Sequence, residues 1–168
     1  MEDKRLIYAA YGSNLLKERF MVYILGGNFR GRTYQGCSDK SEPEDVGWIK
    51  VPHRLYFARK SALWDNKGVA FLSCLKEKNP EYHTVVRLWK IRECQFHEVK
   101  SQEGSFYNKI LDLGEKDGYG IFTLTGCWEQ EIEAPSESYL KVISDGLKET
   151  TGWTDNEINA YLARFLPI

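Results

Sequence analysis

The sequence lacks a long apolar run and lacks an excess of charge of either sign. Its first apolar run extends only from Leu6 to Ala10. A secretory signal needs about 7–15 such residues and a membrane span about 20. The 168 residues include 23 Lys and Arg and 24 Asp and Glu, which gives a net charge of -1. Binding to nucleic acid or to an anionic membrane requires a basic excess, so we expect a cytoplasmic protein that binds neither.

Neither a cysteine framework nor a metal-binding motif is present. The cysteines and histidines are widely spaced, at Cys37, Cys74, Cys94, Cys127, His53, His83 and His97. Without a C-x-x-C pair, the cysteines are typical of reduced intracellular thiols. The histidines match neither H-x-H nor H-E-x-x-H, so the ligand set of a zinc hydrolase, such as a metal-dependent deacetylase, is missing. We expect no metal and no cofactor.

The sequence has enough length and apolar content for one hydrophobic core. Hydrophobic residues make up 42% and aromatic residues 14% of the chain. A domain of roughly 150 residues buries about 70% of its unfolded surface, which stabilises a core without disulfides or metal. We therefore predict a single domain over residues 1–168.

The order of predicted elements indicates an α+β domain with a mixed, partly barrel-like β-sheet and flanking helices. β-branched and aromatic runs bounded by turn residues predict strands at 6–11, 51–58, 68–75, 84–91, 107–113 and 119–125. Helical spacing predicts helices at 15–25 and 92–102, and two more that begin near Ser136 and Thr154. Thr154 and Glu157 form a candidate capping box. Residues 26–50 show no periodicity, and we predict an extended loop there, of the kind that often forms a functional lid.

The segment Tyr11-Gly12-Ser13-Asn14-Leu15 joins the first predicted strand to the first predicted helix. The first amides of a helix have no partner within the helix, and the helix dipole places a partial positive charge there. Such a turn suits a carboxylate, a phosphate or a developing oxyanion. In the alternative interpretation, Ser13 or Asn14 caps the helix and Gly12 makes the turn.

Several segments together resemble the gamma-glutamylcyclotransferase-like superfamily. The segments are YAAYGSNL (8–15), HRLYFARKSALWDNKGVAFL (53–72), VRLWKIRECQFHEVKSQEG (86–104) and SYLKVISDGL (138–147). The specific parts are the YGSN loop at Tyr11–Asn14 and the pair Glu103-Gly104. The resemblance implies this superfamily's fold over most of the chain.

Glu103 is the acidic residue that the resemblance singles out among 24. It closes a predicted helix just before Gly104, where the negative end of the helix dipole disfavours an ionised carboxylate. Burial there would raise its pKa toward the range of a general acid and base. The resemblance implies that Glu103 is catalytic and that Tyr11, Gly12, Ser13, Asn14 and Leu15 bind substrate. The implied reaction cleaves a small gamma-glutamyl amide or peptide by intramolecular cyclisation, which releases 5-oxoproline and a free amine.

Three alternatives remain at this point. Cys37 is a candidate nucleophile if a histidine activates it, although the sequence shows no such partner nearby, and the other cysteines are expected to pack in the core. One or two basic side chains could line an anionic-substrate pocket, although such runs usually form solvated faces: Arg30, Arg32, Arg54, Arg59 and Lys60. Finally, a non-catalytic relative with this fold could bind a small acidic metabolite or a protein partner.

Overall fold

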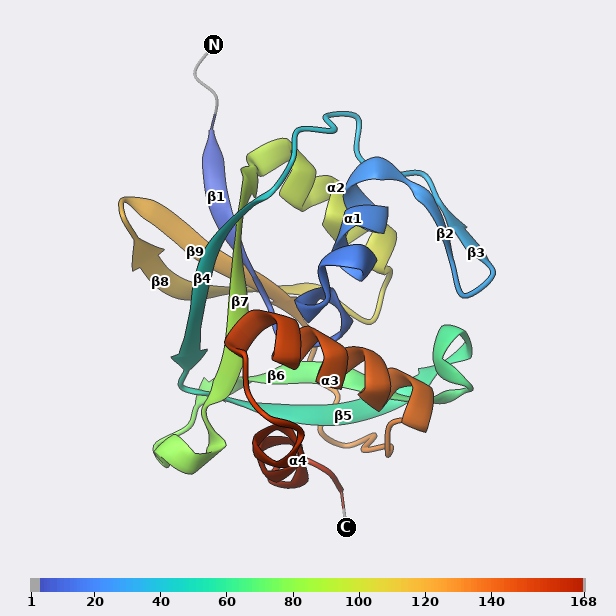
Figure 1. Cartoon of the computed structure of the whole chain (residues 1–168), viewed down its shortest axis with the longest axis vertical. Helices are drawn as coiled ribbons and strands as arrows, with labels where there is room; N and C mark the ends of the chain where they lie inside the picture. The colour runs from blue at the N-terminus through green and yellow to red at the C-terminus, as the bar shows by residue number, and fades with distance from the viewer. Residues whose placement is uncertain (1–3, 168) are drawn as a thin grey trace.

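The largest sheet contains five strands in the order β4-β7-β1-β9-β8 (Figure 1). The computed structural model describes residues 4–167. The five strands are β1 (Arg5–Ala10), β4 (Glu44–Val51), β7 (Thr84–Arg92), β8 (Lys109–Lys116) and β9 (Tyr119–Thr125). Strand β1 pairs antiparallel with β7 and parallel with β9. The predicted α+β class and mixed sheet are confirmed, and within the described range the sheet does not close into a barrel.

A second, two-stranded sheet and four helices complete the core. The second sheet pairs β5 (His53–Ser61) with β6 (Lys67–Lys76). The helices are α1 (Lys17–Leu25), α2 (Glu93–Glu103), α3 (Glu137–Thr151) and α4 (Asp155–Ala163), with short 3₁₀ turns at η1 (Ser13–Leu15), η2 (Ala62–Trp64) and η3 (Pro80–Tyr82). Within residues 4–167, no helix is long and apolar enough to cross a membrane.

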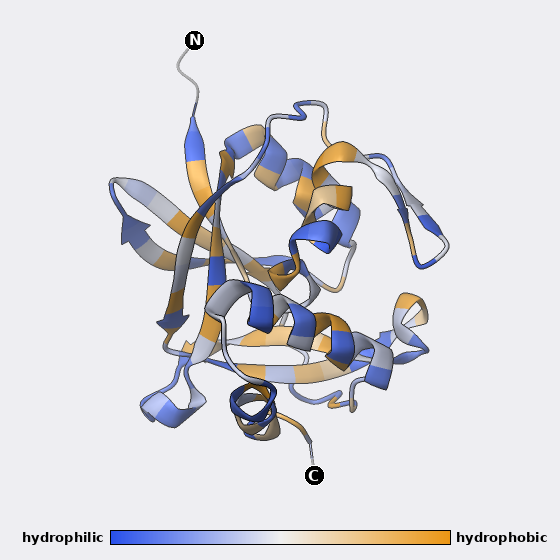
Figure 2. Ribbon diagram, in the orientation of Figure 1, coloured by the Kyte–Doolittle hydropathy of each residue, from blue (hydrophilic) through white to orange (hydrophobic). Residues whose placement is uncertain are grey.

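Two apolar clusters hold these layers together (Figure 2). Helix α3 runs along the β5–β6 sheet in Figure 1, and the rings of Phe57 and Tyr139 meet there at 6.3 Å between centroids. Helices α1 and α2 belong to the other cluster, in which Phe20 stacks on Tyr8 of β1 at 5.1 Å. Strand β1 contributes side chains to both clusters, so its C-terminal end emerges between them.

The prediction of a loop over residues 26–50 is wrong for much of that segment. The chain there forms a hairpin of β2 (Gly27–Phe29) and β3 (Arg32–Tyr34), followed by the edge strand β4. The register of β4 against β7 shifts between Asp45 and Trp48. Such a bulge breaks the alternation by which a strand is identified in a sequence. The capping box at Thr154 and Glu157 is confirmed.

The predicted cap of the first helix is also wrong. Ser13 and Asn14 lie in the 3₁₀ turn η1, and α1 begins later, at Lys17, with no side-chain cap. The backbone N–H of Lys17 donates instead to Glu149 Oε1 of α3 at 2.9 Å. A carboxylate of the protein therefore occupies the positive end of α1, which frees Ser13 and Asn14 from a capping role.

Candidate functional site

Glu103 lies at the last position of α2, and its carboxylate meets side chains from two other elements. Asn14 Nδ2 of the η1 turn donates to Glu103 Oε1 at 3.0 Å. Tyr23 Oη of α1 donates to Glu103 Oε2 at 3.1 Å. Asn14 Nδ2 also lies 3.0 Å from Tyr8 Oη. The fold therefore joins the YGSN turn to Glu103, which lies 89 positions further along the chain.

The pKa of Glu103 is raised above the ordinary value of a glutamate. Burial is the largest cause, because it penalises the ionised form. The positive charge of Arg19 and the hydrogen bonds from Tyr23 and Asn14 act in the opposite direction and offset part of the effect. The carboxyl group is therefore placed to exchange a proton closer to neutral pH than a surface glutamate would.

This shift predicts that Glu103→Gln raises the stability of the protein at neutral pH. A glutamate whose folded pKa exceeds its unfolded value of about 4.3 loses stability as the pH rises from the unfolded to the folded value. Gln does not ionise, so the variant avoids that loss. Thermal melts from pH 4 to pH 8 should show a higher Tm for the variant at pH 7. The Tm should rise by about 2–4 °C for each 1 kcal/mol gained in the free energy of unfolding. The difference should vanish near pH 4, and a lower Tm at pH 7 would contradict the prediction.

Arg19 forms the far side of this site, although the sequence analysis did not name it as a candidate. Its side chain is 2% exposed. Its Nη2 donates to Tyr23 Oη at 2.8 Å and to Tyr34 Oη at 3.1 Å, while Nε and Nη1 have no partner in the described range. The rings of Tyr23, Phe29 and Tyr34 lie 4.4–4.8 Å from its guanidinium carbon. The β2–β3 hairpin therefore encloses a buried positive charge that binds the same tyrosine as Glu103.

Two adjoining cavities, of about 30 and 60 Å³, lie at Glu103. They share four lining residues: Ser13, Glu103, Tyr107 and Tyr139. Tyr107 Oη donates to the carbonyl of Ala70 at 2.9 Å, and Tyr139 Oη accepts from its N–H at 3.0 Å. Burial raises the pKa of both phenols, so they are neutral hydrogen-bonding groups.

The Tyr11–Asn14 turn supplies one wall of the smaller cavity. A Cβ at Gly12 would lie 3.1 Å from Tyr139 Oη and 3.3 Å from Ala70 Cβ, a tight fit that would push on the Tyr139 side chain. The N–H groups of Gly12, Ser13 and Asn14 have no acceptor in residues 4–167. Unpartnered amides on a cavity wall are donors for an anion or a polarised carbonyl oxygen.

Four of the five residues predicted to bind substrate are brought together with Glu103, and Leu15 is not. Tyr11, Gly12, Ser13 and Asn14 line the cavity. Leu15 is 1% exposed and packs in the core, and its N–H donates to the carbonyl of Gly12. The role of these residues in binding stays a prediction.

The alternative nucleophile Cys37 is buried and hydrogen-bonded to backbone carbonyls. Its Sγ donates to the carbonyl of Tyr23 at 3.3 Å. Burial, together with the nearby Glu98, raises the pKa of the thiol to about 12. A thiol that ionises at that pH is a poor nucleophile near neutrality.

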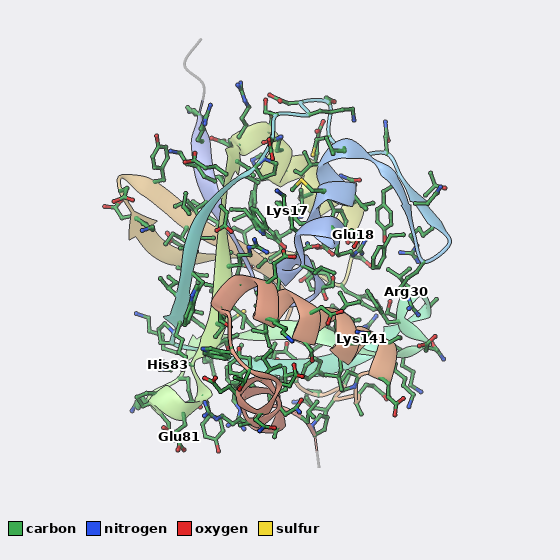
Figure 3. The ribbon with its side chains drawn as sticks, viewed as in Figure 1. Lys17, Glu18, Arg30, Glu81, His83 and Lys141 are labelled. Carbon is green, nitrogen blue, oxygen red and sulfur yellow. The ribbon has the colours of Figure 1, made fainter. Side chains whose placement is uncertain are left out.

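Of the five basic residues considered for a pocket, Arg32 lines the larger cavity at Glu103. The others bind acidic side chains elsewhere on the surface: Arg30 with Asp65, Arg54 with Glu77, Arg59 with Glu131 and Lys60 with Glu133. Figure 3 shows Arg30 between the β2–β3 hairpin and the turn that follows β5. These four therefore belong to solvated faces.

The histidines lie apart from the site. Figure 3 shows His83 and Glu81 at one end of the molecule, away from Lys17 and Glu18 of α1. His83 Nε2 and His53 Nδ1 lie 2.9 Å from the backbone carbonyls of Glu77 and Ser73, respectively. In residues 4–167, no three His, Cys, Asp or Glu side chains are grouped so as to hold a metal ion.

Solved structures with the same fold include a gamma-glutamyl cyclotransferase, which is 19% identical and superimposes with a TM-score of 0.70 over 95% of this chain and 88% of its own. An uncharacterized protein from Homo sapiens is 20% identical, with a TM-score of 0.69 over 96% and 88% of the two chains. YkqA from Bacillus subtilis is 17% identical, with a TM-score of 0.62 over 97% and 55%. The fold that the sequence resemblance implied is therefore confirmed.

No family model matches the sequence. Among curated proteins, histone deacetylase 5 of Arabidopsis thaliana is 29% identical over 92% of this chain. The chain spans 30% of the length of that relative.

Proposed function

We propose that the protein cleaves a gamma-glutamyl amide or peptide by intramolecular cyclisation and releases 5-oxoproline and a free amine. The observation that carries the proposal is the carboxylate of Glu103, with its raised pKa, held by Asn14 at a cavity whose wall is the Tyr11–Asn14 turn. The shared fold with a gamma-glutamyl cyclotransferase supports the same reaction class.

Glu103 acts as the proton carrier in this mechanism. Its carboxylate takes a proton from the α-amino group of the gamma-glutamyl unit, and the freed amine attacks the side-chain carbonyl carbon. A five-membered ring with a tetrahedral carbon results. Glu103 then gives its proton to the departing nitrogen, the original C–N bond breaks, and 5-oxoproline leaves with the amine.

The Tyr11–Asn14 turn stabilises negative charge in the same mechanism. The amides of Gly12, Ser13 and Asn14 are the donors available to the substrate carboxylate or to the oxygen of the tetrahedral carbon. Because the nucleophile belongs to the substrate, the protein has to orient the reacting groups, carry one proton and stabilise one anion.

The size of the two cavities sets a condition on this proposal. Ligand sites usually enclose about 300 Å³ or more, which exceeds either cavity at Glu103. The cavities share Tyr107 and Tyr139 on their walls. We infer that they join when the glutamyl end of a substrate enters, while the departing amine stays nearer the surface. We place this reaction in the cytoplasm, with residues 1–168 acting as one domain.

A panel of gamma-glutamyl peptides and gamma-glutamyl amines tests the proposal. The purified protein should convert at least one of them to 5-oxoproline and the matching amine in equal amounts, measured by mass spectrometry. Free glutamate in place of 5-oxoproline would contradict cyclisation. If panel members raise the Tm without being consumed, the alternative is favoured, in which the protein binds a small acidic metabolite without turnover. A ligand that binds the native state stabilises it by mass action.

A further inference from the structure

Two cysteines that the sequence interpretation assigned to core packing lie side by side near the surface. Cys74 of β6 is part-buried, and Cys127, two residues beyond β9, is exposed. Their sulfur atoms are 3.5 Å apart. Core packing is therefore wrong for Cys127, and it is also wrong for Cys94, which is exposed.

The contact between the two thiols is built into the junction of the two sheets. Leu72, two residues before Cys74, donates its N–H to Thr125 Oγ1 at 2.9 Å and accepts from the same hydroxyl at 2.7 Å. Thr125 lies two residues before Cys127. Tyr56 Oη donates to the carbonyl of Gly126 at 2.5 Å and accepts from the N–H of Trp128 at 3.0 Å. The backbone is thus held on both sides of Cys127, and the two thiols face each other across a fixed gap.

From this geometry we propose that Cys74 and Cys127 form a reversible intramolecular disulfide, a redox modification site separate from the proposed cyclisation. Closing the gap from 3.5 Å to a bond of about 2.05 Å needs a small movement of the side chains. Such a disulfide in an intracellular protein is characteristic of a redox-sensing pair rather than of a permanent staple.

Glutathione disulfide is an oxidant that completes the step. The exposed Cys127, as a thiolate, attacks one sulfur of glutathione disulfide and releases one glutathione thiolate, which leaves a mixed disulfide on Cys127. Cys74, as a thiolate, attacks the sulfur of Cys127 and releases the second glutathione. Two protein thiols are oxidised to one disulfide, one glutathione disulfide is reduced to two thiols, and the two protein thiol protons end on them. Burial and the adjacent Cys127 raise the pKa of Cys74 to about 11, so the second attack should accelerate as the pH rises.

The disulfide would tie together two strands that wall the candidate site. Ala70 of β6 and Leu124 of β9 both line the smaller cavity. The Leu72–Thr125 hydrogen bonds already join these strands, and a covalent bond beyond them would prevent the two sheets from separating at this end. Oxidation should therefore rigidify this side of the site and stabilise the fold.

Tryptic mapping of the full chain tests the proposal, because each cysteine falls in its own peptide: 33–40, 68–76, 93–100 and 117–141. After incubation with glutathione disulfide and quenching of free thiols, peptides 68–76 and 117–141 should appear joined, with the loss of two hydrogen atoms. Cys94→Ser should leave this product unchanged, and Cys127→Ser should abolish it. A persistent glutathione adduct on Cys127 without the joined peptides, or a crosslink to Cys37 or Cys94 in its place, would overturn the proposal.

Thermal melts supply a second readout that is independent of enzymatic activity. The oxidised protein should melt several degrees above the reduced protein, and dithiothreitol should reverse the shift. Cys127→Ser, a change at an exposed side chain, should melt at the same temperature with and without oxidant; Cys127→Ala serves the same purpose if the serine variant does not fold. An equal oxidant-dependent shift in a folded Cys127 variant would overturn the assignment, whatever the outcome of the substrate panel.

Discussion

Replacing Glu103 with Gln should lower the rate of 5-oxoproline release by roughly 10²–10⁴-fold, which is the usual contribution of a general acid and base. Gln has nearly the shape of Glu and retains an oxygen that can accept from Asn14 Nδ2, which now donates to Glu103 at 3.0 Å. It cannot take the proton of the α-amino group. The loss should therefore appear in kcat for the best substrate of the panel, measured as 5-oxoproline formed per minute.

A matched control is available on the same helix. Glu93 lies at the other end of α2, is half exposed, and pairs with His97. Glu93→Gln removes the same charge from the same element and should leave the rate within about twofold of the wild type, because it touches no group of the site. The assignment would fail if Glu103→Gln released 5-oxoproline at the full rate of the wild type.

The pairing of the Tyr11–Asn14 turn with Glu103 could be predicted from the sequence because both belong to short motifs with restricted chemistry. A turn with free amides and a carboxylate at a helix end are recognisable one by one, and the family resemblance joined them. The sequence did not show how Asn14 is used. The sequence left two roles open for Asn14, substrate binding and helix capping, whereas the chain makes a 3₁₀ turn that directs its amide group to Glu103.

Arg19 was missed although its spacing contained a signal. Leu16, Arg19, Phe20, Tyr23 and Ile24 follow the i, i+3, i+4, i+7, i+8 pattern of one helix face. The sequence analysis did not single out Arg19, and a buried arginine is rare unless it is paired. Its partners, Phe29 and Tyr34, come from the hairpin in the segment predicted as a loop. A local pattern could not reveal a charge that only tertiary contacts make acceptable.

The cysteine pair shows the same limit more sharply. Cys74 and Cys127 are 53 positions apart, with no spacing rule to connect them. They meet because β6 of one sheet and β9 of the other converge at Leu72 and Thr125. Long-range strand contacts of this kind depend on topology, which composition and periodicity do not encode.

Replacing Arg19 with Met should move the acidic limb of the kcat/KM profile to higher pH. Arg19 is a positioning residue in our interpretation: its Nη2 holds the Tyr23 hydroxyl at 2.8 Å, and that hydroxyl donates to Glu103 at 3.1 Å. Its positive charge also lowers the pKa of Glu103 against the effect of burial. Without that charge the carboxyl group stays protonated to a higher pH and cannot accept the α-amino proton. At a pH below the acidic limb, kcat/KM of the variant should be about tenfold lower for each pH unit by which the limb has moved.

Comparison with Arg19→Lys separates charge from geometry. Lys keeps the positive charge but lacks the planar fork that reaches both Tyr23 and Tyr34, so its limb should lie between those of Arg and Met. Arg54→Met is the matched control, because it removes a charge that is stacked 3.9 Å from the ring of Tyr82 and paired with Glu77. Its profile should coincide with that of the wild type. If Arg19→Met lowered kcat/KM by the same factor at every pH, Arg19 would contribute to packing alone. The pKa of Glu103 would then depend only on burial and on its hydrogen bonds. If the acidic limb instead shifts when the positive charge is removed, Arg19 takes part in proton transfer through Glu103. Its positive charge would then keep Glu103 ionised at the pH where the reaction needs a base.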